Sequence, residues 1–232
     1  MINIGRSIRA ALRGKPPYPA MQGDVLVFGS APDPVVPPEL LEGHTIITAN
    51  AAQLSLEALG VEAPHITCMR STMGDGKATS ADKLKRLAGR RTGHLVLFPL
   101  REDPQCEVQR RLLAEIGYTY DTLQVLHRLD VGTIYNSVLH PGPVTLHRSY
   151  GPSMGLRAVL LALAAGASRV AVAGISFRSG GASYTTMDYT RIHVDADQGI
   201  FARLRDLGLP VFATDRALSE DTGLPLWSSE QG

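Results

Sequence analysis

The sequence is poor in the residues that several common classes of protein depend on. Among its 232 residues are only two cysteines, Cys68 and Cys106, too few for a disulfide framework or a four-thiolate zinc site. No apolar run reaches the length of a membrane-spanning helix; the richest, 159–165, lies between Arg157 and Arg169. The net charge of +1 argues against a broad nucleic-acid-binding surface. We therefore expect a protein of a reducing, cytosolic compartment that does not bind nucleic acid.

Lysine is also scarce, which bears on nucleotide chemistry. The chain has four lysines, at positions 15, 77, 83 and 85. None completes the Gly-x-x-x-x-Gly-Lys-Ser/Thr loop, so the chain is not a P-loop nucleotidase. No Gly-x-Gly-x-x-Gly follows the first apolar run, which disfavours a dinucleotide-dependent oxidoreductase.

From Asp24 onward, short apolar runs alternate with helical stretches. The runs lie at 24–30, 44–50, 65–69, 94–98, 169–175 and 210–214, and the helical stretches at 51–60, 79–90, 104–117, 153–166 and 196–208. This pattern predicts an α/β fold, with one Rossmann-like domain over residues 21–232 and a mostly parallel sheet covered by helices on both faces. The stretch 119–150 mixes strand-like and loop-like sequence, and we expect irregular structure or an antiparallel edge there.

Residues 1–20 form a separate basic segment. On a helical wheel, apolar and basic side chains of residues 2–15 fall on opposite faces: Ile4, Ile8, Ala11 and Leu12 against Arg6, Arg9 and Arg13. The segment lacks the apolar region of a secretory signal, so we expect it to be retained. Two interpretations stay open: a helix packed on the domain, or a helix of residues 1–15 lying on the anionic inner face of a membrane.

In a parallel sheet, ligands bind outside the carboxyl ends of the strands. Gly29 and Ser30 follow the first apolar run, and Asn50 ends the second. Serine and asparagine side chains at these points can bind a nucleotide's ribose or phosphate. They also commonly satisfy the backbone groups of turns and helix caps, and both roles stay open.

The sequence Gly151-Pro-Ser-Met-Gly155 precedes a helical stretch. Ser153 is a favourable N-cap, and Gly166 a favourable end for this helix. A helix that starts in a Gly/Ser turn presents free amides and the positive end of its dipole, which suits a phosphate group. Gly155 would let a ligand approach the backbone closely.

A polar loop at 177–198 follows the fifth apolar run, and loops of this length are usually functional. It carries Tyr184, Tyr189, His193, Asp195 and Asp197. Asp195 with Gln198 resembles a capping box that starts the next helix. The two aspartates could instead bind a metal together with His193, and His193 could act as a general base. The cap and the base are compatible with each other.

These motifs resemble those of the sialyltransferase-like glycosyltransferases, which use CMP-activated sugars. The sequence 27–52 is similar to the family's large motif, which matches Gly29, Ser30 and Asn50. The sequence 152–177 is similar to the small motif, which matches Ser153 and Gly155, with Met154 in place of a threonine. The very small motif falls on His193, with Gln198 in place of a glutamate.

The resemblance implies transfer of a sialic-acid-like sugar from a CMP donor to a glycan or lipid acceptor, with inversion and without a metal. His193 would be the base, and Ser153, Gly155, Tyr184 and Tyr189 would hold the phosphate. No cofactor is implied beyond the CMP-sugar itself, which is the donor substrate. Two alternatives stay open: a Mg²⁺-dependent enzyme like the pyrophosphokinases, for which Asp195 and Asp197 are the clustered carboxylates, and a non-catalytic protein that binds nucleotide or associates with a membrane.

Overall fold

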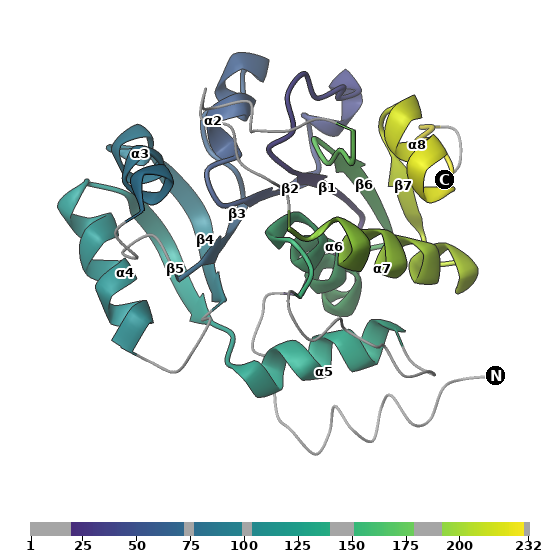
Figure 1. Ribbon diagram of the computed structural model, residues 1–232. Coiled ribbons are helices and arrows are strands. Elements are labelled where there is room, and N and C mark those ends of the chain that lie inside the picture. The colour runs from purple at the N-terminus through teal and green to yellow at the C-terminus, as the bar shows by residue number, and fades with distance from the viewer. Residues whose placement is uncertain (1–19, 72–76, 99–103, 140–150, 179–191, 230–232) are drawn as a thin grey trace.

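A computed structural model describes residues 20–71, 77–98, 104–139, 151–178 and 192–229. Strands alternate with helices along this part of the chain (Figure 1). The strands are β1 (Asp24–Phe28), β2 (Thr45–Ala49), β3 (Ile66–Arg70), β4 (Arg91–Phe98), β5 (Thr119–Val125), β6 (Arg169–Ala173) and β7 (Val211–Ala213). The α-helices are α2 (Gln53–Leu56), α3 (Ala78–Leu87), α4 (Pro104–Glu115), α5 (Arg128–Leu139), α6 (Met154–Ala165), α7 (Val194–Asp206) and α8 (Arg216–Thr222), and two 3₁₀ turns are η1 (Pro38–Leu40) and η2 (Glu57–Leu59).

All seven strands form one parallel sheet in the order β5-β4-β3-β2-β1-β6-β7. The chain builds outward from β1 to β5 and then returns to place β6 on the other side of β1. This reversal makes the sheet doubly wound, with its topological switch point between β1 and β6. The predicted Rossmann-like α/β class is confirmed.

Helices cover both faces of the sheet, and the strand sequences account for this. Successive side chains on a strand point to opposite faces, and both sets are apolar here. On β1, Val25 and Val27 pack in a core cluster with α5, α6 and α7, whereas Leu26 and Phe28 pack with η1 and α2. Figure 1 shows α5, α6 and α7 stacked on one side of the sheet.

The structure differs from the sequence-based expectation over part of 119–150. The described portion is neither irregular nor antiparallel: β5 pairs in parallel with β4, and α5 follows it. The alternation along β5 is weak because an edge strand exposes much of its length, and its residues are mostly exposed or half-buried. The helix α8 at the C-terminal end was not predicted either, because its seven residues are too few to show a helical period.

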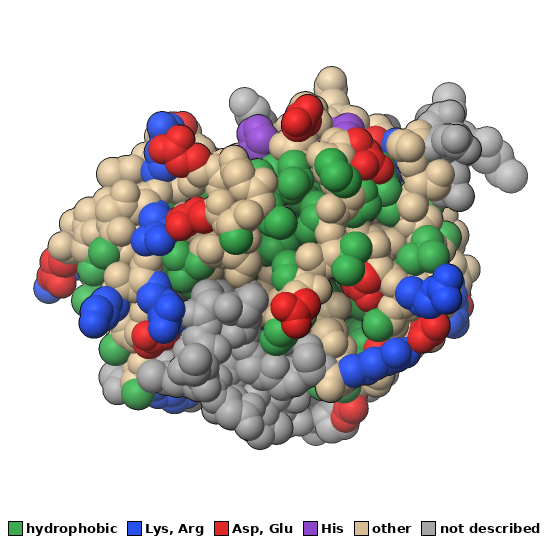
Figure 2. All heavy atoms as spheres, turned by 90° about the horizontal axis from the view of Figure 1, so that it is seen from above, with side chains coloured by type: hydrophobic (Ala, Val, Ile, Leu, Met, Phe, Trp, Pro, Cys, Tyr) green, Lys and Arg blue, Asp and Glu red, His purple; other side chains and the backbone are tan. Residues whose placement is uncertain are grey.

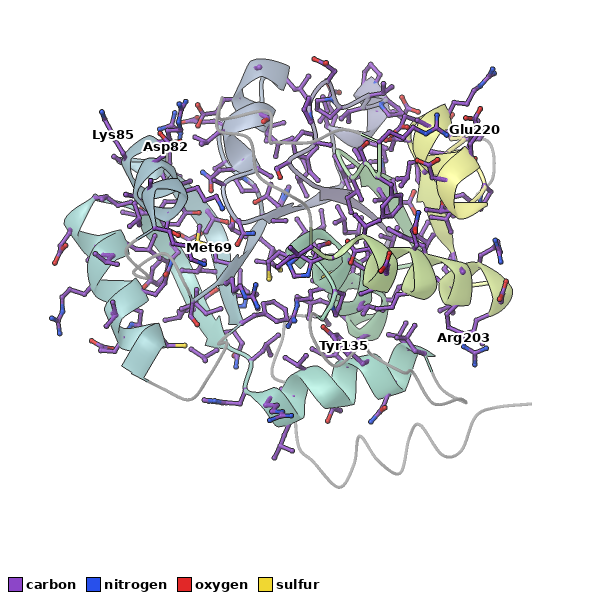
Figure 3. All side chains as sticks on the ribbon, in the orientation of Figure 1. Met69, Asp82, Lys85, Tyr135, Arg203 and Glu220 are labelled. Atoms are coloured by element: carbon purple, nitrogen blue, oxygen red, sulfur yellow. The ribbon has the colours of Figure 1, made fainter. Side chains whose placement is uncertain are left out.

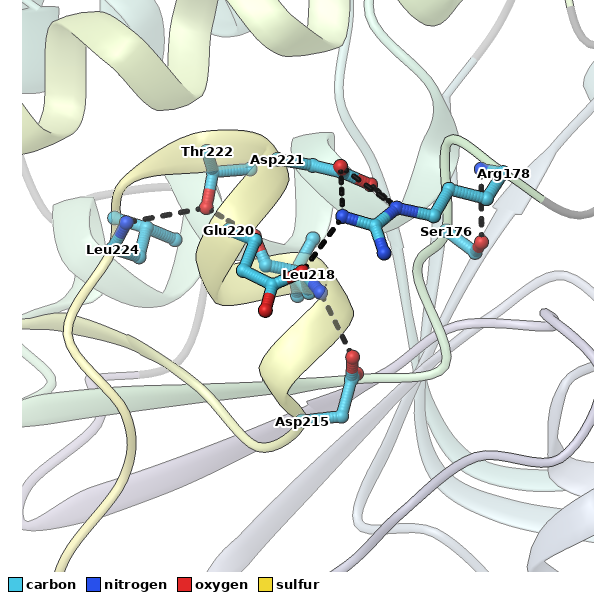
Figure 4. A network of polar contacts seen from close by, with 8 residues as sticks. All are labelled: Ser176, Arg178, Asp215, Leu218, Glu220, Asp221, Thr222 and Leu224. Carbon is cyan, nitrogen blue, oxygen red and sulfur yellow. Dashed lines mark hydrogen bonds and ion pairs between the residues drawn. The ribbon is translucent and has the colours of Figure 1, made fainter.

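The chain that leaves β6 is tied to α8 by a polar network (Figure 4). The Arg178 guanidinium donates three hydrogen bonds to the Asp221 carboxylate, at 2.7, 2.9 and 3.1 Å, and one to Glu220 at 3.0 Å. The α8 helix itself starts at Asp215, whose carboxylate accepts from the Leu218 amide at 2.8 Å. Arg178 therefore fixes where the polar segment 179–191 departs, although that segment lies outside the described residues.

The surface seen in Figure 2 carries apolar side chains near its centre, with basic and acidic side chains interspersed around them. The described side chains of this face thus form no extended basic patch, in keeping with the small net charge. Among the described residues, no helix combines the length and apolar character needed to cross a bilayer. The basic segment 1–20 lies outside the described residues except for Ala20, so both interpretations of it remain predictions.

Candidate active site

The candidate residues come together because of the topology. In a parallel sheet all the carboxyl ends lie at one edge, and a helix that leads into the next strand starts at that same edge. The starts of α6 and α7 therefore lie beside the ends of β1, β3 and β6. Contacts described below confirm that Asn50, Ser153 and His193 belong to this one edge.

The switch point is a close contact between two glycines. A Cβ on Gly29 would lie 2.3 Å from the Gly174 carbonyl oxygen, and a Cβ on Gly174 would lie 2.6 Å from that of Gly29. Gly174 also has a φ of +63°, a left-handed conformation that glycine adopts readily. The approach of β1 and β6 therefore requires Gly29, whether or not a ligand binds next to Ser30.

Asn50 has a strained backbone and a defined contact. Its φ is +54°, which is uncommon for a residue other than glycine. The side-chain oxygen accepts a hydrogen bond from the Arg70 amide at 3.1 Å, across the ends of β2 and β3. Asn50 therefore joins two strand ends, and the amide nitrogen of its side chain is not needed for that contact.

The start of α6 matches the predicted cap. The Ser153 hydroxyl accepts from the Leu156 amide at 3.3 Å, and Gly166 ends the helix in a left-handed conformation. No hydrogen bond is found for the amides of Met154 and Gly155 among the described residues. A Cβ on Gly155 would lie 2.8 Å from Ile175 Cδ1, so its small size serves the packing of α6 on the end of β6.

The sequence from Gly151 to Gly155 also has the letters Gly-x-Ser-x-Gly of a hydrolase nucleophile elbow. In that elbow the serine hydroxyl is the nucleophile. Here the Ser153 hydroxyl instead accepts the Leu156 amide, as an N-cap does. We therefore interpret Ser153 as the N-cap of α6.

The predicted capping box at Asp195 is wrong. The helix α7 starts two residues earlier than that box requires, with His193 as its N-cap, and Asp195 lies in its first turn. Asp195 is exposed while Asp197 is buried, so their carboxylates face different surroundings. The Asp197 carboxylate accepts from the Ser153 amide at 2.8 Å and so joins the starts of α6 and α7.

The arrangement of these aspartates also argues against the metal site. Among the described residues, no group of three or more His, Cys, Asp or Glu side chains is placed to hold a metal ion. Because Asp195 and Asp197 diverge, they do not offer two carboxylates to one cation. The carboxylate pair that a Mg²⁺-dependent phosphoryl transfer needs is therefore not formed by these residues.

His193 is held by the turn that leads into α6. Its Nδ1 lies 2.6 Å from the Gly151 carbonyl oxygen. A carbonyl can only accept, so Nδ1 carries the proton and Nε2 carries the lone pair of the neutral ring. Burial and the charges of Arg70 and Arg157 lower the pKa of His193, and the Gly151 carbonyl opposes this shift. The imidazole is therefore neutral at pH 7, the form that can accept a proton.

Two arginines and a tyrosine complete this edge, and sequence reasoning missed all three. Arg70 ends β3, Arg157 lies in the second turn of α6, and Tyr135 on α5 packs in the same core cluster as α6. Figure 3 shows Tyr135 pointing from α5 toward α6. The sequence did hold a signal for Arg70: in a strand, every second side chain points to the same face, so Arg70 shares a face with Ile66 and Cys68, which pack in one cluster with α6. Nothing comparable marked Tyr135.

The two tyrosines predicted to donate hydrogen bonds to the phosphate, Tyr184 and Tyr189, lie outside the described residues. Their roles therefore stay predictions.

Comparison with solved structures places this geometry in a known fold. The structure of α-2,3-sialyltransferase Cst-I from Campylobacter jejuni aligns with a TM-score of 0.57 at 10% identity, over 89% of this chain and 81% of that one. The sialyltransferase CstII from Campylobacter jejuni, in complex with the analogue CMP-3FNeuAc, aligns with a TM-score of 0.53 at 10% identity, over 89% and 86%. A complex of CstII with a trisaccharide acceptor and CMP aligns with a TM-score of 0.55 at 8% identity, over 91% and 88%.

The chain has the sialyltransferase fold. The similarity extends over most of both chains, as the motifs at 27–52 and 152–177 predict. At identities of about a tenth, it establishes the architecture and not the substrate. No protein-family model matches the sequence, and no curated protein sequence matches it.

Proposed function

We propose that the protein is a glycosyltransferase that moves a sialic-acid-like sugar from a CMP donor to a glycan or lipid acceptor. The observation that carries this proposal is the setting of His193. A neutral imidazole is fixed by the Gly151 carbonyl at the switch-point edge, directly beside the capped start of α6. The fold is shared with sialyltransferases whose structures hold CMP and a trisaccharide acceptor.

The proposed reaction divides the work between the two helix starts. His193 Nε2 accepts the proton of the acceptor hydroxyl as that oxygen attacks the anomeric carbon of the sugar. The bond from the anomeric carbon to the phosphate oxygen breaks, and CMP leaves with the electron pair. Attack opposite the leaving group inverts the anomeric centre.

The leaving phosphate would be held at the start of α6. The amides of Met154 and Gly155 and the positive end of the helix dipole suit a monophosphate, and Ser153 keeps that turn in place. We propose Tyr184 and Tyr189 as further hydroxyl donors, and Ser30 and Asn50 as contacts of the nucleotide. A monophosphate carries less charge than a diphosphate, so we propose that transfer proceeds without a metal ion.

A test begins with nucleotide binding by calorimetry, using CMP and ATP with Mg²⁺ or with EDTA. The proposal expects CMP to bind equally well in EDTA. Binding that requires Mg²⁺ and a triphosphate would favour a pyrophosphokinase-like enzyme, and no binding of either nucleotide would favour a non-catalytic protein.

The base is tested with His193→Ala, and with His127→Ala as an exposed control. His193→Ala should keep CMP binding and lose transfer from a CMP-sugar by about 10²- to 10⁴-fold, the usual contribution of a general base. The control should be unaffected. Because the pKa of His193 is lowered, the base stays neutral to lower pH than a free histidine. The acidic limb of the rate profile should therefore have its midpoint below about 6.5. Full activity in His193→Ala would show that another group is the base.

A further inference from the structure

Arg70 and Arg157 are both linked to Phe98 at the end of β4. Phe98 is the register partner of Arg70 on the neighbouring strand, and the Arg157 guanidinium lies 5.8 Å from the centre of the Phe98 ring. The Arg157 Nε also donates to the Pro152 carbonyl at 3.0 Å. These contacts position the Arg157 guanidinium at the carboxyl edge and leave most of its donors available, and Arg70 ends β3 at the same edge.

Gly151 separates Arg157 from His193. A Cβ on Gly151 would lie 3.0 Å from Arg157 Nη2, and the Gly151 carbonyl is the atom that holds His193. The guanidinium group and the imidazole thus approach the same peptide from two sides. An anion that contacts Arg157 at this point would also lie close to His193.

Among the described residues, neither arginine has a carboxylate partner. In the described part of the chain, no Asp or Glu oxygen forms an ion pair with Arg70 or Arg157. The two cations repel each other, and together with burial this repulsion lowers the pKa of Arg70. Both also repel a proton on His193. Half-buried like charges without a counter-ion are unfavourable, and an anion between them would remove that cost.

A buried hydroxyl faces the same place. Tyr135 is only 6% exposed, and its hydroxyl has no hydrogen-bond partner among the described residues. It lies close enough to Arg157 and Asp197 to interact electrostatically with both, and burial raises its pKa. A protonated phenol without a partner among the described residues, close to the Arg157 guanidinium, is a donor that an anion could use.

We infer that Arg70 and Arg157, with the Tyr135 hydroxyl, form a binding site beside His193 for a phosphate or carboxylate group of a substrate. The site itself stands on the placement of these groups, and its assignment to a substrate rests on the proposed function. A CMP-linked sugar acid has both kinds of anion next to its anomeric carbon, so either the nucleotide phosphate or the sugar carboxylate could occupy the site. Charge-assisted hydrogen bonds from guanidinium groups suit both.

The test uses the full-length protein and the variants Arg70→Gln, Arg157→Gln and their combination. Arg110→Gln is the matched control, because Arg110 is exposed on α4 and its ion pair among the described residues is with Glu107 on its own helix. The first probe is inorganic phosphate, which does not depend on the proposed function. The His193 ring is followed by NMR through a pH titration, with and without phosphate, and its signal is identified by its absence in His193→Gln.

In the wild type and the Arg110 control, phosphate should raise the pKa of His193. In the double variant this effect of phosphate should vanish, and the pKa without phosphate should lie above that of the wild type, because the repulsion is gone. If phosphate leaves the pKa of His193 unchanged in the wild type, or changes it equally in the double variant, the inference is overturned. If Arg157→Gln fails to fold, Arg157→Lys retains the positive charge and the aliphatic part of the side chain against Phe98. Arg70→Gln then still removes one of the two cations.

Calorimetry then identifies the source of the anion, using CMP and N-acetylneuraminic acid as separate probes. A loss of about tenfold or more in CMP affinity for each variant assigns the site to the phosphate. The same loss confined to N-acetylneuraminic acid assigns it to the sugar carboxylate. If wild-type protein responds to phosphate and does not bind CMP, the proposed function fails while the anion site stands.

Discussion

Replacing Gly155 with alanine separates packing from ligand binding at the start of α6. The added Cβ would lie 2.8 Å from Ile175 Cδ1 and 3.3 Å from its Cγ1. Ile175 is only 8% exposed, so its side chain has little room to turn away. Overpacking of this kind costs about 1–3 kcal/mol. The better helix propensity of alanine offsets about 0.5–1 kcal/mol of this cost.

The expected result for Gly155→Ala is therefore a net loss of about 1 kcal/mol in the free energy of unfolding, within bounds of about 0 and 2.5 kcal/mol. Gly199→Ala is the matched control, because Gly199 lies inside α7 and a Cβ there would meet nothing within 4 Å. That control should gain about 0.5–1 kcal/mol. Urea unfolding followed by circular dichroism measures both, provided that the m-values agree.

A double mutant identifies the atom responsible. Ile175→Val removes Cδ1, the atom nearest to the new Cβ, and should cost about 0.5–1.5 kcal/mol alone. Combined with Gly155→Ala it should cost less than the sum, with a coupling of about 1 kcal/mol. CMP affinity in the folded Gly155→Ala protein should stay near the wild-type value, because the amide remains. If Gly155→Ala stabilises the protein as much as Gly199→Ala does, the packing argument is wrong.

Three further outcomes are expected. Asp197→Ala should lower the free energy of unfolding by about 1–3 kcal/mol, because it leaves the Ser153 amide without its acceptor. Asp197→Asn keeps an acceptor and should lower it less, and equal losses for the two variants would contradict this argument. Cys68 and Cys106 are buried and form no disulfide bond, so native protein should show no two-proton mass loss. Burial raises the pKa of Cys68, so Cys68 should react slowly with thiol reagents. Deleting residues 1–15 should leave the melting temperature nearly unchanged. If the protein does not sediment with anionic vesicles, or sediments equally well after this deletion, the membrane interpretation is excluded.

Local sequence was a good guide where a feature depends on neighbours along the chain. The alternation of apolar runs and helical stretches predicted six of the seven strands, because central parallel strands are buried on both faces and read as continuous apolar segments. The cap at Ser153 and the stop at Gly166 are local backbone chemistry, and both were confirmed. At the edge β5, the exposed side lost the apolar signal, and the prediction failed.

The candidate site was predictable only in part, because several of its contacts join residues far apart in the sequence. The sequence around Asp197 suggested a metal ligand, yet its carboxylate accepts a hydrogen bond from the Ser153 amide at the start of another helix. The sequence suggested that the absence of a side chain at Gly155 makes room for a ligand, yet the side chain of Ile175 occupies the space where a Cβ of residue 155 would lie. Such long-range contacts leave no periodic trace in the sequence.

The sequence alone determined six of the described strands and most of the helices, and it indicated that polar residues would follow the strand ends, since these features depend on local periodicity and turn chemistry. Only the tertiary structure decided which of those residues share a site. The return of the chain to place β6 beside β1 brings Gly29 against Gly174 and sets the starts of α6 and α7 at the same edge. Arg70 and Arg157, 87 positions apart, interact electrostatically because α6 packs on the face of the sheet to which Ile66 and Cys68 of β3 point. Packing and electrostatic interactions depend on the distance between residues in space, and the order of these residues along the chain does not reveal that distance.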